Sequence, residues 1–262
     1  MSFKHIAATL PLIISSPLMA SDIQIGLGLG MSSAYEGSDK YIVIPDALAQ
    51  YTAATESYGI FSIGTQGAKW QYNLFDNFNF GIIGSYMQGR KEEIGFAGNK
   101  NKDLKGMGDL KGGAAAGIEL SYIINKNIIY INSLTALGKR EYGDVNVDNA
   151  TRIEFGLNSH FDINSDWSID SNISTRYVNK NYNQAYFGVS YQQSLNTEFT
   201  EYIPEAGFKD VGALFAINYR INNGFYLNFK NGGYYLLGDA ANSSITKQKQ
   251  GLITIIGLSY LF

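Results

Sequence analysis

The chain has 262 residues, four prolines, no cysteine and a formal net charge of −3. The lack of cysteine excludes a disulfide scaffold and thiol chemistry, and the mild acidity argues against a nucleic-acid-binding protein. Glycine (29 residues) and tyrosine (19 residues) are abundant, whereas charged residues make up only 16%. This composition suits a single β domain whose strands twist and meet a lipid interface.

The first 20 residues have the pattern of a secretory signal peptide. A weakly basic start precedes an apolar stretch over residues 6–18, which two prolines interrupt. The stretch is short for a membrane anchor, which needs about 20 apolar residues. We therefore predict cleavage after Ala20 and a single domain over 21–262. No later stretch reaches the length of a transmembrane helix.

Several later segments alternate apolar and polar residues with a period of two, which indicates half-buried β-strands. In residues 152–162, for example, Ile153 and Phe155 face one way, while Glu154 and His160 face the other. We predict strands near 22–32, 41–53, 57–69, 77–88, 109–123, 127–138, 150–162, 167–178, 209–220, 225–237 and 250–262.

The connections between these strands fall into two kinds. Tight turns have hairpin composition, and longer polar stretches lie between them. Short turns that alternate with long loops are typical of a membrane barrel and have no reason to occur in a soluble sandwich. The turns lie at 75–77, 124–127, 163–166 and 221–224, and the long loops at 90–106, 139–148, 179–208 and 238–249.

The strand count decides the size of the barrel. Eleven strands are predicted above, but a bacterial barrel with both ends on the same side needs an even number. Residues 64–67 read Gly-Thr-Gln-Gly, which is a turn that can divide 57–69 into two strands. We therefore predict an all-β, antiparallel transmembrane barrel of about 12 strands, with 10 as the alternative. The closing segment 253–262 is an alternating strand with an aromatic end, as in outer-membrane barrels.

Five sequence blocks, in order along the chain, carry a family resemblance. They are S-A-Y-E-G-S-D at 33–39, Y-F-G-V-S at 186–190, Y-I-P-E-A-G-F-K-D-V-G at 202–212, L-G-D-A-A-N-S-S-I at 237–245 and the closing G-L-S-Y-L-F. With these blocks the chain resembles the MipA/OmpV family of outer-membrane proteins over essentially the whole mature sequence.

The resemblance implies a location in the outer membrane of a Gram-negative bacterium. The namesake of the family is a scaffold that links a murein lytic transglycosylase to a peptidoglycan synthase, and other members are porin-like, adhesive or antibiotic-responsive. A scaffold that couples such enzymes through its periplasmic turns is therefore the leading hypothesis, and a narrow pore for small solutes or antibiotics is the alternative. The resemblance supplies no catalytic residues and no cofactor or metal site.

Charged residues on the polar faces of the strands are candidates for the barrel lumen. His160, the only histidine after the signal peptide, also suggests an outer-membrane hydrolase, since a base near a carboxylate is part of hydrolase chemistry. We favour lumen lining, because a barrel cannot expose these groups to lipid. Whether their mixed charges leave a water path or close it stays open. The candidates are Glu119, Arg152, Glu154, His160, Asp162, Asp170, Arg176, Arg220 and Lys230.

Aromatic residues near the predicted strand ends are expected to anchor the barrel at the membrane interface. These anchors are Tyr122, Trp167, Tyr219, Tyr260 and Phe262. Asp39, Asp210 and Asp239 lie at the bases of loops, where we expect solvated acids and no metal site. The expected partners are membrane lipid and lipopolysaccharide, the barrel-assembly machinery through the last strand, and the two murein enzymes named above.

Overall fold

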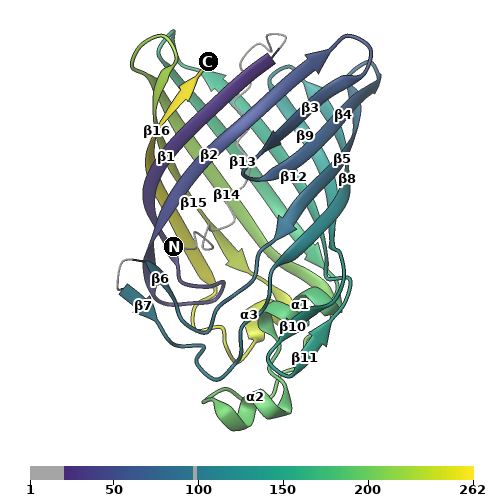
Figure 1. Ribbon diagram of the computed structural model, residues 1–262, viewed down its shortest axis with the longest axis vertical. Coiled ribbons are helices and arrows are strands. Elements are labelled where there is room, and N and C mark those ends of the chain that lie inside the picture. The colour runs from purple at the N-terminus through teal and green to yellow at the C-terminus, as the bar shows by residue number, and fades with distance from the viewer. Residues whose placement is uncertain (1–20, 97–98) are drawn as a thin grey trace.

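The computed structural model describes residues 21–96 and 99–262, which form a closed barrel of 12 antiparallel strands (Figure 1). The predicted signal peptide lies outside the described residues and stays a prediction. The barrel strands are β1 (Ser21–Ser33), β2 (Tyr41–Thr55), β3 (Gly59–Gly64), β4 (Gly67–Phe75), β5 (Phe78–Met87), β8 (Gly113–Ile124), β9 (Asn127–Ala136), β12 (Thr151–Asp162), β13 (Trp167–Val178), β14 (Gly207–Arg220), β15 (Phe225–Leu236) and β16 (Gln250–Leu261).

Each barrel strand pairs with its neighbours along the chain, and the first strand closes the wall against the last. Gln24 of β1 lies opposite Leu261 of β16, and the pairing continues to Ser32 opposite Ile253. The predicted division of 57–69 is confirmed, since β3 and β4 flank the two-residue turn 65–66. The prediction of 12 strands is therefore confirmed.

The alternating sequence pattern places apolar side chains outside and polar ones inside. Leu27 on β1 is 75% exposed on the outer face, while the glycines on either side of it face the lumen. Ile118 on β8 and Ile173 on β13 are also exposed, at 51% and 50%. In water such a surface would be costly, whereas a bilayer solvates it, and the hydrogen-bonded closed wall leaves few edges.

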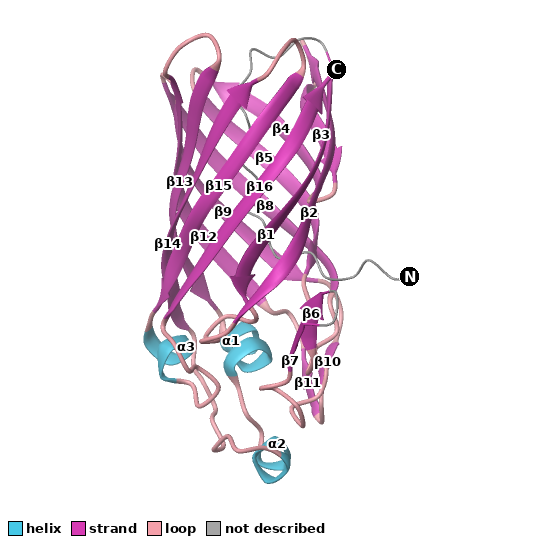
Figure 2. Cartoon of the chain, turned by 90° about the vertical axis from the view of Figure 1, so that its left-hand side faces the viewer, coloured by secondary structure: helices cyan, strands magenta, loops and turns pink. Residues whose placement is uncertain are grey.

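The connections are sorted between the two ends of the barrel (Figures 1 and 2). One end, here the short-turn end, carries the tight turns and the start of β1 and end of β16. The other, the long-loop end, carries 34–40, 88–112, 137–150, 179–206 and 237–249. The one exception is the turn 65–66, which belongs to the long-loop side but lies part-way along the wall because β3 and β4 are short.

The long loops fold into a compact cap over the long-loop end (Figure 2). Loop 179–206 therefore covers the barrel mouth, which sequence reasoning left open. Among the described residues, no helix is long and apolar enough to cross a membrane. The cap elements are β6 (Ile94–Phe96), β7 (Asn99–Asn101), β10 (Arg140–Tyr142), β11 (Val145–Val147), α1 (Lys180–Phe187), α2 (Tyr191–Asn196) and α3 (Gly238–Asn242).

Side-chain caps fix the start of the two helices in loop 179–206. The Asn179 side chain accepts a hydrogen bond from the backbone N–H of Tyr182 at the start of α1. Ser190 and Gln193 form a reciprocal capping box at the start of α2. Such caps satisfy N–H groups that a short helix cannot pair internally, so they favour one starting residue for each helix.

Aromatic side chains gather on the outer face at the short-turn end. The Trp167 and Tyr219 rings lie 4.6 Å apart between centroids, and Tyr260 is 4.6 Å from Phe225 and 4.5 Å from Phe262. Tyr122 is also exposed, and lies opposite Phe78 of the neighbouring strand β5. All five predicted anchors thus lie at one rim, as expected of an aromatic girdle at a membrane interface.

Candidate functional site: the lumen and its cap

A continuous ladder of hydrogen bonds crosses the inner wall near the short-turn end. His160 Nδ1 lies 2.7 Å from Asp170 Oδ1, and Asn218 donates to the other Asp170 oxygen at 2.7 Å. Asn228 donates to Asn218 at 2.9 Å, and Ser259 donates to Asn228 at 2.8 Å. The ladder joins the five strands from β12 to β16. Because each polar group finds a partner on the next strand, their burial is compensated.

A second polar group lies nearer the cap. The Tyr130 hydroxyl donates to Glu154 at 2.6 Å, and Asn172 donates to both Tyr130 and Asn158 at 2.8 Å. Asp170, Asn172 and Glu154 each keep only 3% of their surface accessible. A wide water-filled channel would leave such groups exposed, so this side of the lumen is packed.

Two ion pairs that involve strands β2, β4 and β8 are less deeply buried. Lys69 on β4 forms an ion pair with Glu119 on β8 at 2.5 Å, with side-chain exposures of 20% and 13%. Lys230 on β15 pairs with Asp46 on β2 at 3.1 Å, with exposures of 21% and 12%. These pairs satisfy the charges but leave the four side chains partly accessible.

The predicted lumen residues fall into two groups. Asp162 lies at the short-turn rim beside Lys126 and is 52% exposed, and Arg220 pairs with Asp166 there at 3.1 Å. Neither of them reaches the middle of the barrel, because each occupies the last position of its strand. The inner face of the wall carries Glu119, Arg152, Glu154, His160, Asp170, Arg176 and Lys230.

The surroundings of His160 do not resemble a hydrolytic site. Its second ring nitrogen lies 2.9 Å from Asp162, so both nitrogens contact carboxylates. A general base needs one nitrogen free to accept a proton from a nucleophile. No serine or threonine hydroxyl of the described residues contacts the ring, and these residues hold no cluster of three metal-ligating side chains. The arrangement serves to hold β12 and β13 together.

We expect replacement of His160 by alanine to weaken the barrel without removing an activity. The change leaves Asp170 with only the Asn218 bond in a buried position. Leaving a buried group unpaired costs about 1–3 kcal/mol. Urea unfolding in detergent micelles should show this loss, while Ser165→Ala in the exposed turn 163–166 should change little. An unchanged unfolding midpoint for the histidine variant would contradict the assigned role.

A buried cluster of charges lies where the lumen meets the cap. Arg176 donates to Asp210 at 2.8 Å, Lys209 contacts Asp210 at 2.9 Å, and Lys209 contacts Glu36 of loop 34–40 at 2.5 Å. The side chains of Lys209 and Asp210 are fully buried. The expectation of a solvated Asp210 is therefore wrong, because helix α1 covers it: the Lys209 ammonium lies 5.7 Å from the Tyr182 ring.

The cap has an apolar core of its own that joins the barrel end. Its centre is fully buried Met107 and Tyr142, which pack with residues from all five long loops. Ile42 and Ile44 of β2 and Ile255 of β16 face inward and belong to the same core. Burial of apolar area on this scale holds the cap on the mouth as part of the folded structure.

Two buried arginines connect the loops of the cap. Arg90 donates to the Tyr186 carbonyl at 2.5 Å and to the Tyr142 hydroxyl, while Arg140 donates to the Gln88 carbonyl at 2.7 Å. The Tyr186 hydroxyl also donates to Gln88. Burial raises the pKa of the Tyr186 phenol, so it stays a neutral donor at physiological pH. These bonds tie α1 to loops 88–112 and 137–150.

Asp103 joins three loops at the cap surface. It accepts from Lys40 at 2.5 Å and lies 3.7 Å from Lys247, which brings together 34–40, 88–112 and 237–249. Desolvation opposes the charged form of Asp103, but hydrogen bonds from Lys40 and Asn101 outweigh it and lower its pKa. The charged carboxylate therefore favours the closed cap.

Acidification should weaken this junction. Because the pKa of Asp103 is lower in the folded protein than in the unfolded chain, its contribution to stability is complete above the ordinary value of about 3.9. The contribution disappears as the pH falls through the lowered pKa. Protease cleavage of loop 88–112 should be faster in Asp103→Asn than in wild type at pH 7, and the two rates should converge once the pH falls below the lowered pKa of Asp103. A constant difference at both pH values would contradict this assignment.

The functional residues that sequence reasoning missed belong mostly to the cap. Glu36, Lys209, Tyr182 and Tyr186 lie in loops or next to them, where no periodicity marks a buried face. One signal was available: Glu36, Tyr186 and Lys209 lie in the sequence blocks that carry the family resemblance.

The comparison with protein families agrees with this geometry. The family described as "MltA-interacting protein MipA" matches residues 25–262, which is nearly the whole described chain. The protein belongs to the MipA family. It is thus an outer-membrane barrel of the MipA type, as the sequence blocks predicted. A comparison with curated protein sequences finds no match.

Solved structures with a similar shape include other barrels. An outer-membrane channel of Pseudomonas putida F1 has 10% identity and a TM-score of 0.49, covering 97% of this chain and 100% of that one. The NanC porin has 10% identity and a TM-score of 0.47, covering 92% and 99%. The translocator domain of the Neisseria meningitidis autotransporter NalP has 8% identity and a TM-score of 0.47, covering 94% and 90%. Likeness at this level says nothing about what this MipA-family protein does.

Proposed function

We propose that this protein is a non-catalytic scaffold in the outer membrane of a Gram-negative bacterium, closed to solutes, that holds peptidoglycan enzymes at its short-turn end. The observation that carries the proposal is the closed barrel mouth, in which α1 and the cap core cover a lumen whose polar ladder is buried. A permanently open channel would not carry such a plug, whereas a scaffold needs only rigidity.

Orientation and family support the same proposal. Outer-membrane barrels place their short turns in the periplasm and their long loops outside. The short-turn end would then face the peptidoglycan, with tight turns at 125–126, 163–166 and 221–224 as contact sites. The family description names an interaction with MltA, and this chain would take a partner of that kind, a lytic transglycosylase, together with a peptidoglycan synthase.

Site-specific photocrosslinking in cells tests the proposal. A photoreactive amino acid at Asn223 lies at the short-turn end, and one at Gln192 on α2 lies at the opposite, cap end. We expect a lytic transglycosylase and a synthase to be captured from position 223 and not from position 192. Capture from neither position by a correctly inserted barrel would overturn the proposal, as would capture from position 192 alone.

A second candidate function is a gated path for small solutes. The observation in its favour is the partial accessibility of the Lys69–Glu119 and Lys230–Asp46 pairs inside the lumen. Such a path would need the cap to move. Planar-bilayer recordings of the purified protein distinguish the two functions, since a scaffold that is closed to solutes stays silent and a gated pore shows discrete openings.

A further inference from the structure

One stretch of the barrel wall lacks a neighbouring strand. β2 pairs with β1 over residues 41–53, but its pairing with β3 covers only 50–55. The last contact on that side is the Thr65 N–H, which donates to the Ala49 carbonyl at 2.9 Å. Within the described ranges, residues 41–48 form no ladder on the β3 side; β6 and β7 lie near this part of β2 without pairing to it.

The facing strand ends its pairing at the same level. β5 pairs with β4 as far as Gly84, opposite Ala68. Beyond this point the Ser85 hydroxyl donates to the Gln66 carbonyl at 2.8 Å, which ties the hairpin tip to β5. The wall therefore has a gap, called the lateral gap here. It is bounded by residues 41–48, the hairpin tip 64–67 and residues 85–87.

Pro45 indicates that no further β-strand adds to β2 at the lateral gap. The Ala49 carbonyl points toward β3, and backbone groups of alternate residues point the same way, so position 45 also faces the gap. Proline has no N–H to donate there, and proline on an edge strand discourages the addition of a strand. Ala47 and Ala49 have small side chains on the outer face, so they leave space beside this edge of β2.

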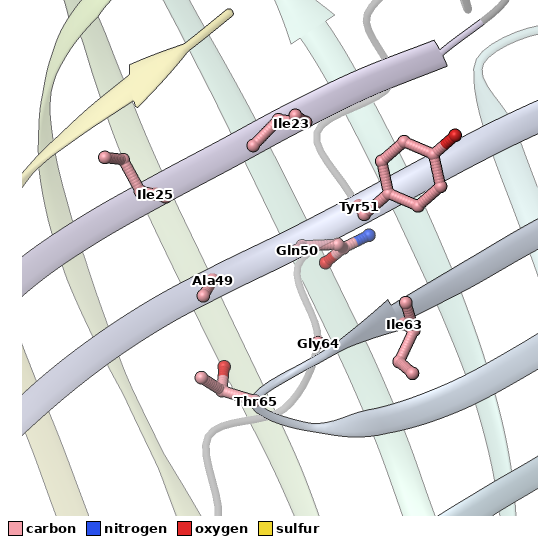
Figure 3. Close-up of a pocket in the computed structure, with 8 residues that line it drawn as sticks. All are labelled: Ile23, Ile25, Ala49, Gln50, Tyr51, Ile63, Gly64 and Thr65. Atoms are coloured by element: carbon pink, nitrogen blue, oxygen red, sulfur yellow. The ribbon is translucent and has the colours of Figure 1, made fainter.

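A groove on the outer face adjoins the hairpin tip (Figure 3). Its volume is about 580 Å³, and four of its lining residues are exposed apolar or aromatic side chains on the lipid-facing wall: Ile23, Ile25, Tyr51 and Ile63. A second groove of about 440 Å³ shares Tyr51 and Ile63 and continues past Trp70. In this position the lining favours a hydrocarbon chain over water.

The same groove contains polar groups at its inner side. Gln50 is a lumen-facing residue of β2, and Thr65 is at the hairpin tip, yet both line the groove. Two lumen-facing positions away along β2, Asp46 pairs with Lys230 in the half-buried part of the interior. Apolar side chains outside and uncharged polar groups at the wall thus form one continuous surface.

We propose that the lateral gap is a binding site for a single-chain amphiphile, with its hydrocarbon tail in the outer groove and an uncharged, hydrogen-bonding head at Gln50 and Thr65. Such a head lies beside Ala47, the nearest residue of β2 whose backbone groups face the gap without a ladder partner among the described residues. Backbone groups that stay unpaired in hydrocarbon cost several kcal/mol each, so a hydrogen-bonding head is favoured here. With the long loops outside, the gap opens toward the outer half of the bilayer. The site does not depend on a peptidoglycan partner.

Photolabelling of the full protein in phospholipid bilayers tests this proposal. The probe is a monoacylglycerol with a diazirine on its acyl chain, and labelled peptides are identified by mass spectrometry. We expect saturable labelling around Ile25, Ala49 and Ile63 that unlabelled monoacylglycerol competes away. Ala49→Phe, which fills the groove from the outer face, should weaken the apparent affinity about tenfold, because it removes the burial of about two methylene groups.

Two further variants separate the site from nonspecific lipid contact. Ala213→Phe enlarges an outward alanine on β14, outside the groove, and should leave labelling unchanged. Gln50→Leu should weaken labelling while the barrel stays folded. Uniform labelling around the wall without saturation would overturn the proposal, since the probe would then report only membrane hydrocarbon. So would a disulfide between two copies through Ala47→Cys, which would make the edge a contact between barrels.

Discussion

Replacing Lys209 with methionine is expected to destabilise the folded protein by about 3–5 kcal/mol, the cost of removing one partner from a buried ion pair. Asp210 is fully buried and Glu36 has one buried carboxylate oxygen, so both carboxylates would lose their shared ammonium group. Methionine has a similar length and leaves little cavity. Urea unfolding in micelles, followed by the gel mobility of the folded barrel, measures the change.

An exposed ion pair of the same loop region provides the matched control. Lys180 contacts Glu205 at 2.6 Å, but their side chains are 51% and 67% exposed. Lys180→Met should therefore change stability by less than about 1 kcal/mol, as is usual for surface pairs. Equal effects of the two methionine variants would show that the Lys209 cluster is not a determinant of stability. The double variant Lys209→Met with Glu36→Gln should cost less than the sum of the single variants, because the two residues interact.

The strands of the barrel wall could be predicted because the pattern that marks them depends only on residues close together in the sequence. A strand in a membrane barrel must alternate lipid-facing and lumen-facing residues, so segments such as 152–162 and 167–178 reveal both their limits and their inner faces. The even strand number then required the turn at 64–67. The sequence-based limits of the other strands differ from the observed ones by a few residues, except for β4, which extends to Phe75, six residues beyond the predicted limit at 69.

The buried ion cluster was not predictable, because it depends on a break in alternation. The pairing of β13 with β14 shifts after Arg176: Asp210 lies opposite Arg176, but Phe208 lies opposite Tyr177. Lys209 is the extra residue of this β-bulge, so two consecutive residues, 209 and 210, both face inward. A strict period of two would have placed Lys209 in the lipid, where its charge could not be compensated.

The cap and the lateral gap also escaped prediction, for a different reason. Both depend on contacts between segments far apart in the chain, such as Glu36 with Lys209 or Arg90 with Tyr186. Loops of this length show no periodicity that marks a buried side. Their polar composition therefore predicts solvent-exposed side chains even where the side chains are in fact buried. The lateral gap exists because the β3–β4 hairpin is short. The only sign of this in the sequence is the position of the turn at 64–67.

Removal of loop 179–206 is expected to open the barrel to ions. Val178 and Gly207 lie opposite each other where β13 meets β14, so a two-residue Asn-Gly turn can replace the loop without stretching the wall. The deletion removes α1 and α2, and with them Tyr182 and Tyr186, which pack over the mouth of the barrel. We expect the wild type to be silent in planar bilayers and the variant to show steady conductance with strong dependence on salt.

The control keeps both the length of the loop and its packing on the barrel mouth. Tyr191→Ala changes an exposed residue of α2, 64% accessible, and should leave the bilayer silent. Folding of the deletion variant can be checked by its gel mobility before and after heating, since an unfolded barrel would also fail to conduct. If the folded deletion variant stays silent, the barrier lies in the lumen itself, at the ladder from His160 to Ser259, and the cap only covers it. If it conducts, the wall encloses a path, and the cap alone accounts for the closed state that the scaffold proposal requires.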